Sequence, residues 1–367
     1  MKIGVLKEDN DARVAIIPEI AKKFIEENNQ VLVETNAGLQ ASFDDKAYTE
    51  AGASVMSREE LLHDVEILVQ INPPGSEILS RLGEGTIVVA LFQPFADPAV
   101  LNLPAEHKLT VMSLDMIPRI TLAQSMDVLS SMASVAGYKA VVKAMDHLPR
   151  YFPMLTTAAG SIPPSKVLIL GAGVAGLQAV ATSRRNGAVV EAFDTRLAAK
   201  EEVESLGAKF VEVEGATDDK DAGGYAVEQT KEYKQRQQAL IQEKAAKADV
   251  VITTAQLRGK PAPLLVTEDT VNKMKPGAVI VDLAASGGGN CELTKDNEVV
   301  HHNGVSIIGD SNLAASMPMH ASQLFSKNIQ NYFKVFLKDG VVNLDPDHEI
   351  IKSSCVVYQG EIRYGQT

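Results

Sequence analysis

The sequence contains three glycines with the spacing of a phosphate-binding turn. Gly171, Gly173 and Gly176 follow the apolar run 166–170 in G-x-G-x-x-G order, and residues 174–185 have the small side chains of a closely packed helix. In such a turn the first glycine permits the tight strand-to-helix connection, the second leaves room for a diphosphate, and the third lets the helix pack against the strand. The free N–H groups at the helix N-terminus favour an anion. The stretch therefore predicts a dinucleotide site.

A carboxylate stands where the second strand of this unit should end. Asp194 follows the apolar run 189–193 and lies 18 residues after the third glycine (194 − 176 = 18), where an acidic side chain accepts hydrogen bonds from the adenosine ribose. Its charge would repel a 2′-phosphate, so the pattern predicts NAD(H) and not NADP(H). Arg196 is discordant, because a guanidinium at this place can pair with a 2′-phosphate. A glycine-rich turn with an incidental aspartate is the structural alternative, and the complete β-α-β pattern disfavours it.

A second group of polar residues stands at the start of a long helical pattern. Arg119, Gln124, Asp127 and Ser130 lie within the stretch 118–130. Asp127 and Ser130 are three residues apart, so they share one helical face near its N-terminus. Two interpretations stay open: the loop serves a ligand, or Asp127 only caps the helix while Arg119 is a solvated cation.

A third loop follows an apolar strand in the stretch 281–292. Its three consecutive glycines, residues 287–289, allow backbone to approach a ligand closely. A flexible turn explains them almost as well, so this loop is only a candidate for contact with the nicotinamide half of a dinucleotide.

The composition excludes several classes of partner. The chain has 367 residues, enough for two domains, with 45% hydrophobic and 22% charged residues and a net charge of −12, which argues against nucleic acid and anionic membrane surfaces. The longest apolar runs fall short of the roughly 18 residues of a membrane span, which indicates a cytoplasmic protein. Cys291 and Cys355 lack C-x-x-C spacing, so we expect two reduced thiols and no metal site.

Short β-rich runs alternate with helical stretches along the chain, which predicts an α/β fold. In the first third, strands are expected at 2–6, 31–34, 66–71, 86–92 and 110–114, with a helix at 18–27. After the glycine turn, strands are expected at 209–213, 249–253, 278–283 and 305–308, and a surface loop at 214–224. With 166–170 and 189–193 these make the six strands of a full dinucleotide fold.

Two long helical patterns join the halves of the chain. Residues 127–147 lead into the second half, and 319–337 return the chain to the first, where 354–364 should form a terminal hairpin. We therefore predict two Rossmann-like domains, each a mostly parallel doubly wound sheet, joined by long helices around a cleft. The expected domains are residues 1–130 with 325–367, and residues 131–324.

Six segments together resemble one family. They are GAGVAGLQAV, FDTR, GGYA, GKPAP, VDLAASGGGNCE and PRITLAQSMDVLSSMASVAGYKA. They span most of the chain and resemble the NAD(H)-binding subunit of the proton-translocating NAD(P) transhydrogenase, whose fold is shared with alanine dehydrogenase. The loop that carries Arg119, Gln124 and Asp127 is the most diagnostic of the six.

The resemblance implies a role for each candidate residue. Arg119, Asp127 and Ser130 would hold the dihydronicotinamide and its carboxamide, and Gln124 would face the NADP-bearing partner. Beyond the glycines, Asp194 and Arg196, the implied cofactor contacts are Val174, Ala175, Thr195, Gly224, Tyr225, Thr254, Ala255, Leu257, Gly287 and Asn290. Hydride transfer between two nicotinamides needs no general acid or base, so these residues would align the rings and exclude water.

The resemblance also implies partners. They are the NADP(H)-binding domain of a beta subunit, membrane-spanning subunits, and a second copy of the chain in a homodimer. Since the sequence ends at Thr367 without the membrane helices that some relatives fuse at this place, we expect a split form that docks peripherally on the cytoplasmic face of the inner membrane.

Two other functions remain as alternatives. The first is a relative of alanine or saccharopine dehydrogenase, since Arg13 matches the arginine that binds the substrate carboxylate in alanine dehydrogenases. However, this chain has Gln70, Gln93 and Ser286 where those enzymes carry a catalytic Lys, His and Asp, so it lacks groups that exchange protons. The second is a non-catalytic NADH sensor, which has no evident need for the loop 119–130.

Overall fold

The computed structural model describes residues 1–213 and 231–365, and the chain divides into two compact units. The first contains Met1–Met132 and Ala314–Thr367, and the second contains Ala133–Leu313. The first transition lies inside helix α6 (Val128–His147). The chain returns to the first unit before helix α11 (Pro318–Phe333), so this helix belongs wholly to that unit and is not divided at 324/325.

The first unit is built on an eight-stranded sheet with the order β19-β18-β6-β5-β4-β1-β2-β3. Its strands are β1 (Lys2–Val5), β2 (Gln30–Glu34), β3 (Ser54–Met56), β4 (Ile67–Val69), β5 (Ile87–Ala90), β6 (Thr110–Ser113), β18 (Cys355–Tyr358) and β19 (Glu361–Ile362). All neighbours are parallel except for the pairs that β18 makes with β6 and β19. The central strands are apolar throughout because helices cover both faces of a parallel sheet.

Two helices of the first unit meet at a buried pair of aromatic rings. The helices of this unit are α1 (Pro18–Glu26), α2 (Asp45–Glu50), α3 (Arg58–Asp64), α4 (Ser76–Leu79), α5 (Asn102–Glu106), α11 and α12 (Glu349–Ser354), with a short hairpin of β16 (Leu337–Lys338) and β17 (Val341–Val342). Phe333 of α11 lies with its ring centroid 5.2 Å from that of Phe24 in α1. Ser326 of α11 accepts a hydrogen bond from the Ile17 N–H and donates one to the Ala15 carbonyl. Helix α11 therefore fixes the segment before α1.

The second unit is built on a seven-stranded sheet with the order β11-β10-β9-β12-β13-β15-β14. Its strands are β9 (Lys166–Leu170), β10 (Val189–Phe193), β11 (Lys209–Phe210), β12 (Val250–Thr253), β13 (Val279–Asp282), β14 (Glu298–His302) and β15 (Val305–Gly309). Its further helices are α7 (Val174–Arg185), α8 (Ala199–Ser205), α9 (Lys231–Lys247) and α10 (Glu268–Lys273). Apart from β14, the order is that of the six-stranded dinucleotide fold. The predicted α/β class and the six predicted strands of this half are confirmed.

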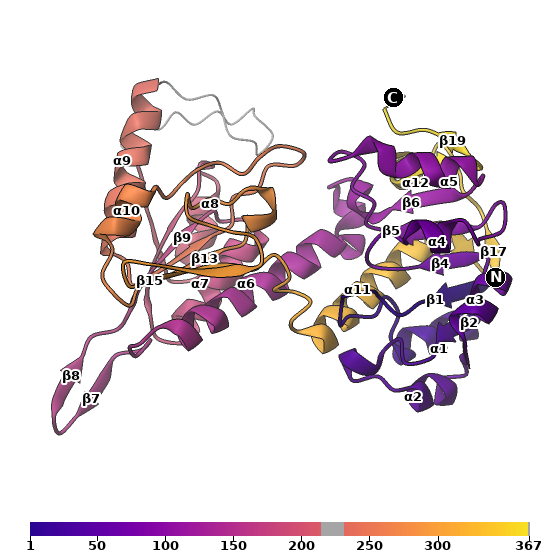
Figure 1. Ribbon diagram of the computed structural model, residues 1–367, viewed down its shortest axis with the longest axis horizontal. Coiled ribbons are helices and arrows are strands. Elements are labelled where there is room, and N and C mark those ends of the chain that lie inside the picture. Colours follow the sequence, from indigo (N-terminus) through magenta and orange to yellow (C-terminus); the bar gives the residue numbers. More distant parts are fainter. Residues whose placement is uncertain (214–230, 366–367) are drawn as a thin grey trace. The chain divides into compact units, whose positions relative to one another are not determined.

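Among the β-structures of the second unit, one strand and one hairpin were not predicted. Strand β14 forms an antiparallel edge against β15, and its alternating exposed residues gave no apolar run. A two-stranded hairpin of β7 (Leu155–Thr157) and β8 (Gly160–Ile162) projects from the unit (Figure 1). Its residues are almost all exposed, so it lacks the buried face from which strands are recognised.

Within residues 1–213 and 231–365, no helix has both the length and the apolar character needed to cross a membrane. In the same residues, no cluster of three or more His, Cys, Asp or Glu side chains is arranged to bind a metal.

Candidate functional site

Two of the three glycines in the turn are required by the fold itself. Gly171 has a φ of +104°, and a Cβ built on it would lie 2.5 Å from the Thr254 hydroxyl oxygen. A Cβ on Gly176 would lie 1.9 Å from the carbonyl oxygen of Gly171. Since real Cβ atoms do not approach that closely, larger residues at these two positions would break the strand-to-helix turn.

Gly173 differs from its two neighbours in the motif. Its φ of −74° is open to any residue, and a Cβ built on it would meet no atom of the described residues within 4 Å. It is exposed at the N-terminus of α7, where no side chain caps the helix. The backbone and its described neighbours therefore give no reason for glycine here. Close approach of a diphosphate to the free N–H groups of α7 gives one.

Val174 and Ala175 form the first turn of α7. Val174 is exposed and Ala175 is half-buried. The carbonyl of Ala175 lies against Gly137 of α6, where an added Cβ would be only 2.1 Å from that oxygen. Sequence reasoning missed Gly137, although a glycine within a helical pattern is a signal for close packing.

Asp194 follows β10 and accepts four hydrogen bonds. One oxygen accepts from the backbone N–H (2.8 Å) and Nε (3.0 Å) of Arg196. The other accepts from the Ala172 N–H (2.8 Å) and from Nη2 of Arg196 (3.1 Å). Asp194 thus holds the glycine turn and a bidentate guanidinium at once. The hydrogen bonds that the Arg196 side chain donates to Asp194 raise the pKa of Arg196 above its ordinary value.

A hydrogen-bond network supports the loops at the carboxyl ends of β9, β12 and β13. The Thr254 hydroxyl donates to the Gly171 carbonyl (3.0 Å). Asn290 is fully buried: its amide oxygen accepts from the Ala255 N–H (3.0 Å) and its amide nitrogen donates to the carbonyls of Ala255 (2.9 Å) and Pro263 (2.8 Å). Its side chain is therefore bonded to backbone on both atoms, and it positions the Ala255 loop.

Sequence reasoning also missed Asp282, at the end of β13. This buried carboxylate accepts five hydrogen bonds. The donors are Thr253 Oγ1, Ala284 N, Asn290 N, Cys291 N and Thr294 Oγ1. Because it binds both ends of the glycine-rich loop 284–291, Asp282 fixes the shape of that loop. An aspartate at a strand end was the available signal.

The remaining predicted contacts are surface positions. Thr195, Leu257 and Gly287 are exposed, with 54% of the Leu257 surface accessible. Gly224 and Tyr225, and the loop predicted at 214–224, lie outside the described residues.

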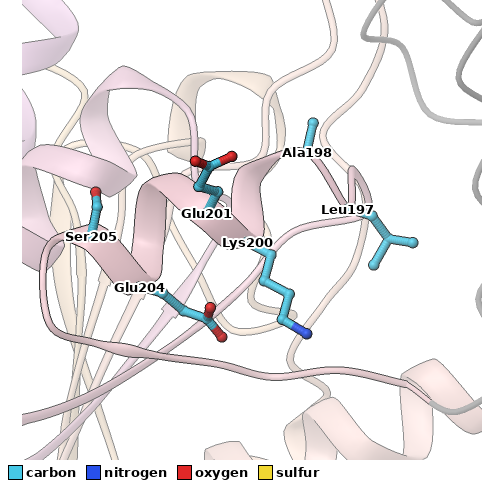
Figure 2. Close-up of a pocket in the computed structure, with 6 residues that line it drawn as sticks. All are labelled: Leu197, Ala198, Lys200, Glu201, Glu204 and Ser205. Carbon is cyan, nitrogen blue, oxygen red and sulfur yellow. The ribbon is translucent and has the colours of Figure 1, made fainter.

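A surface hollow of about 480 Å³ lies along α8, next to Arg196 in the chain. It is lined by Leu197, Ala198, Lys200, Glu201, Glu204 and Ser205. Figure 2 shows Lys200, Glu201, Glu204 and Ser205 on the helix, and Leu197 and Ala198 on the segment that leads into it. The hollow contains none of the predicted cofactor contacts, so the glycine turn and Asp194 remain the candidate nucleotide site.

The loop with the other candidate residues belongs to the first unit. Residues Thr121–Met126 form a 3₁₀ turn, and Asp127 then caps α6. One Asp127 oxygen accepts from the Ser130 N–H (2.9 Å), and the other accepts from the Ser130 hydroxyl (2.6 Å). Asp127 thus caps helix α6, which is one of the two interpretations that the sequence left open. Each oxygen keeps a lone pair for a ligand, since a carboxylate offers about four acceptor positions.

Arg119 and Gln124 are exposed on this loop. The loop is held from behind by α11, because the Asn328 amide donates to the Ser125 carbonyl at 2.8 Å. The structure therefore brings together Asp127 and Ser130, places Arg119 and Gln124 on the same loop, and assigns all four to a different unit from the glycine turn.

A buried polar cluster lies where β1 and β4 of the first unit end. Both oxygens of Asp11 bind the Arg13 guanidinium, with Nη2 to Oδ2 at 2.5 Å. Glu8 accepts from the N–H groups of Ile71 and Asn72 and from the Asn72 side chain. Burial raises the pKa of Glu8 to about 7. Burial alone would raise the pKa of Asp11 too, but hydrogen bonds and the charge of Arg13 outweigh it and lower that pKa.

The positions that bear on amino-acid oxidation carry no titratable side chain. Gln70 is buried, whereas Gln93 and Ser286 are exposed. The Nε and Nη2 donors of Arg13 are taken by Asp11, and its Nη1 donates to Met132 Sδ. Burial raises the pKa of Glu8 to about 7, and the two oxygens of this carboxyl accept from the backbone N–H groups of Ile71 and Asn72.

Two family models match the chain and together cover almost all of it. Residues 4–136 match the N-terminal domain of alanine dehydrogenase/PNT, and residues 140–365 match its C-terminal domain.

Proteins named as transhydrogenase subunits are similar over nearly the whole chain. NAD(P) transhydrogenase subunit alpha of Cereibacter sphaeroides is 42% identical over 99% of this chain and 71% of its own length. A Rhodospirillum rubrum protein, named as the first part of an NAD(P) transhydrogenase subunit alpha, is 40% identical over 99% of this chain and 97% of its own length. The crystal structure of transhydrogenase from Sinorhizobium meliloti superposes with a TM-score of 0.91 at 39% identity, covering 99% of this chain and 100% of that one. The chain therefore belongs to the alanine dehydrogenase/PNT family and, within it, to the NAD(P) transhydrogenase alpha subunits.

Proposed function

We propose that this chain is the NAD(H)-binding subunit of a proton-translocating NAD(P) transhydrogenase and passes hydride between NADH and NADP⁺ bound on a partner subunit. Family membership supports the enzyme class. The observation that carries the nucleotide assignment is Gly173, where the described residues leave open space over the N-terminus of α7. A dinucleotide diphosphate would occupy that space, where the free N–H groups of the helix favour an anion. It would also account for the absence of a side chain at position 173.

The residues divide into two roles under this proposal. The turn 171–176 holds the diphosphate, and Asp194 accepts from the adenosine ribose. Arg119, Asp127 and Ser130 orient the ring and its carboxamide, while Gln124 faces the partner. A bound NADH supplies the hydride, and no side chain of this chain needs to exchange a proton for that step. The contribution of the protein is alignment and exclusion of water.

The partners follow from the same proposal. They are the NADP(H)-binding domain of a beta subunit and the membrane-spanning subunits, with this chain as a homodimer docked on the cytoplasmic face of the inner membrane. The relatives are named as an alpha subunit and as the first portion of one, and these names support a multi-subunit assembly.

Reconstitution tests the proposal directly. The purified chain is mixed with NADH and an NADP⁺-loaded partner domain, and transfer to a nicotinamide analogue is followed spectroscopically. Transfer that requires both proteins is expected. Tight NADH binding without any transfer would favour the sensor alternative, and steady NAD⁺ reduction by L-alanine would favour the dehydrogenase alternative.

A further inference from the structure

The carboxylate that should receive the ribose is already saturated with donors. Asp194 offers about four acceptor positions, and four N–H groups fill them: one from Ala172 and three from Arg196. Two ribose hydroxyls that donate to Asp194 therefore compete with these four donors for its two oxygens.

The four donors differ in how easily they can leave. The Ala172 N–H belongs to the glycine turn, which is buried at that residue, and the Arg196 N–H closes a tight turn on its own neighbour Asp194. The guanidinium lies at the end of a long side chain with 39% of its surface exposed. Release of Nε and Nη2 frees one acceptor position on each oxygen. The two exchangeable donors are therefore both on the Arg196 side chain.

We propose that Arg196 is a specificity-determining residue of the nucleotide site. It competes with the adenosine ribose for Asp194, and the Asp194–Arg196 pair, rather than the aspartate alone, sets the preference for a 2′-hydroxyl over a 2′-phosphate. This inference rests on the proposed NAD(H) function and deepens it.

The charges explain both halves of the selection. When the ribose hydroxyls take the carboxylate, the released guanidinium stays near them, because the Arg196 backbone remains bonded to Asp194. A 2′-phosphate would be attracted by the Arg196 guanidinium but repelled by the Asp194 carboxylate. In addition, Asp194 is better placed than the phosphate to pair with that guanidinium. If residue 194 is neutral, Arg196 becomes available to the phosphate.

Titrations of the whole chain with NADH and NADPH test the competition. Arg196→Gln removes the guanidinium, and Arg196→Lys keeps the charge but cannot form the fork. Both should bind NADH about two- to fivefold more tightly than the wild type, the range expected for breaking a partly exposed ion pair. Arg185→Gln, at the exposed end of α7, is the matched control for loss of one positive charge and should bind NADH as the wild type does. Unchanged or weaker NADH binding by both Arg196 variants overturns the competition.

A neutral residue at position 194 tests the selection. Asp194→Asn retains an oxygen that accepts from the Ala172 N–H, so the turn should stay folded, as circular dichroism can verify. We expect this variant to bind NADPH about tenfold more tightly than the wild type, and the double variant Asp194→Asn with Arg196→Gln to lose that gain. If the double variant keeps it, Arg196 is not the phosphate partner and the inference fails.

These readings separate the inference from the function beneath it, because they measure binding and not hydride transfer. If the wild type bound neither NADH nor NADPH, the proposed function and this inference would both be overturned. If it bound NADH while the Arg196 variants left both dissociation constants unchanged, only the inference would fail.

Discussion

In each unit the strand order of the mostly parallel sheet switches direction at one point. The loops at the two switch points differ: one is rich in glycine and the other carries charged side chains. The reversal lies between β1 and β4 in the first unit and between β9 and β12 in the second. Open α/β sheets bind ligands outside the carboxyl ends of the strands at such a point. In the second unit that place carries the glycine turn 171–176. In the first it carries Glu8, Asp11 and Arg13.

The difference shows that sheet topology offers a site and the side chains decide whether it can be used. In the first unit Asp11 fills the Arg13 fork and Glu8 bonds to the loop after β4, so the groups satisfy one another. In the second unit Gly173 leaves the helix N-terminus uncovered by the described residues. The first unit would then serve the nucleotide through the loop 119–130 and not through its strand ends.

The largest expected effect comes from closing the open position in the second unit. Gly173→Val should raise the dissociation constant for NADH at least about 100-fold, roughly 2.7 kcal/mol, because its side chain projects where the diphosphate would lie. Calorimetric binding beside thermal unfolding is the measurement. The melting temperature should change by less than about 2 °C, since valine tolerates this backbone conformation. Gly176→Ala is the contrast: its Cβ meets the Gly171 carbonyl and should lower stability as well. Wild-type NADH affinity in Gly173→Val would remove the basis of the assignment.

The loop of the first unit should affect rate more than binding. Asp127→Asn keeps the cap of α6, because asparagine caps helices as well as aspartate, but it removes the charge. We expect hydride transfer in the reconstituted complex to fall about ten- to a hundredfold, or roughly 1.5–3 kcal/mol, with NADH affinity nearly unchanged. Transfer within twofold of the wild type would mean that Asp127 only caps the helix and does not orient the nicotinamide ring.

The buried Glu8 at the switch point of the first unit should make the free energy of unfolding depend on pH. Burial raises the pKa of Glu8 from 4.5 to about 7, with Asp11 adding repulsion. Between these values Glu8 holds a proton in the folded chain that it has lost in the unfolded chain, so the contribution of Glu8 to stability is complete below about pH 4.5 and is lost as pH rises through about 7. Glu8→Gln cannot titrate. Urea unfolding at pH 5 and pH 8 should show a loss on the order of 2 kcal/mol in the wild type that this variant lacks. The exposed Glu77→Gln should keep the wild-type dependence; equal pH dependence in all three proteins would refute the linkage.

The smallest expected effect is the absence of an activity. With the Arg13 fork filled and glutamines at positions 70 and 93, the chain should give no detectable NAD⁺ reduction with L-alanine at mildly alkaline pH. Asp11→Asn sharpens this test, since it weakens the ion pair but adds no proton acceptor, and should leave the rate at background. Turnover by either protein would show that the charged cluster of the first unit can still bind and oxidise an amino acid.

The glycine turn and the two strands beside it were predictable to the residue. The boundaries of β9, β10 and α7 match the sequence prediction, because buried parallel strands and a glycine turn leave a strong local pattern. Strand β14 was not predicted, although the dipeptide Asn303-Gly304 before β15 is a signal for a hairpin turn. Both residues have positive φ, 48° and 79°, as a two-residue hairpin turn requires.

The site was predictable only one residue at a time. Sequence spacing identified Asp194 and noted Arg196 as discordant, but it could not show that the two form one bidentate pair. Asn290 was expected to contact the cofactor, and its bonds to Ala255 and Pro263 depend on loops brought together only by the fold. Spacing predicts which chemistry is present. Which acceptor atoms are already occupied by hydrogen-bond donors depends on tertiary contacts.

The route of the chain through the two units also sets an order of events during synthesis. The second unit is one continuous stretch, Ala133–Leu313, whereas the first needs β18 next to β6. A ribosome therefore releases every residue of the second unit before β18 and β19 exist, and domains generally fold as they emerge. Until β18 arrives, one edge of β6 has no partner and can pair with another nascent chain. When β18 is made, it pairs with β6 and removes that open edge.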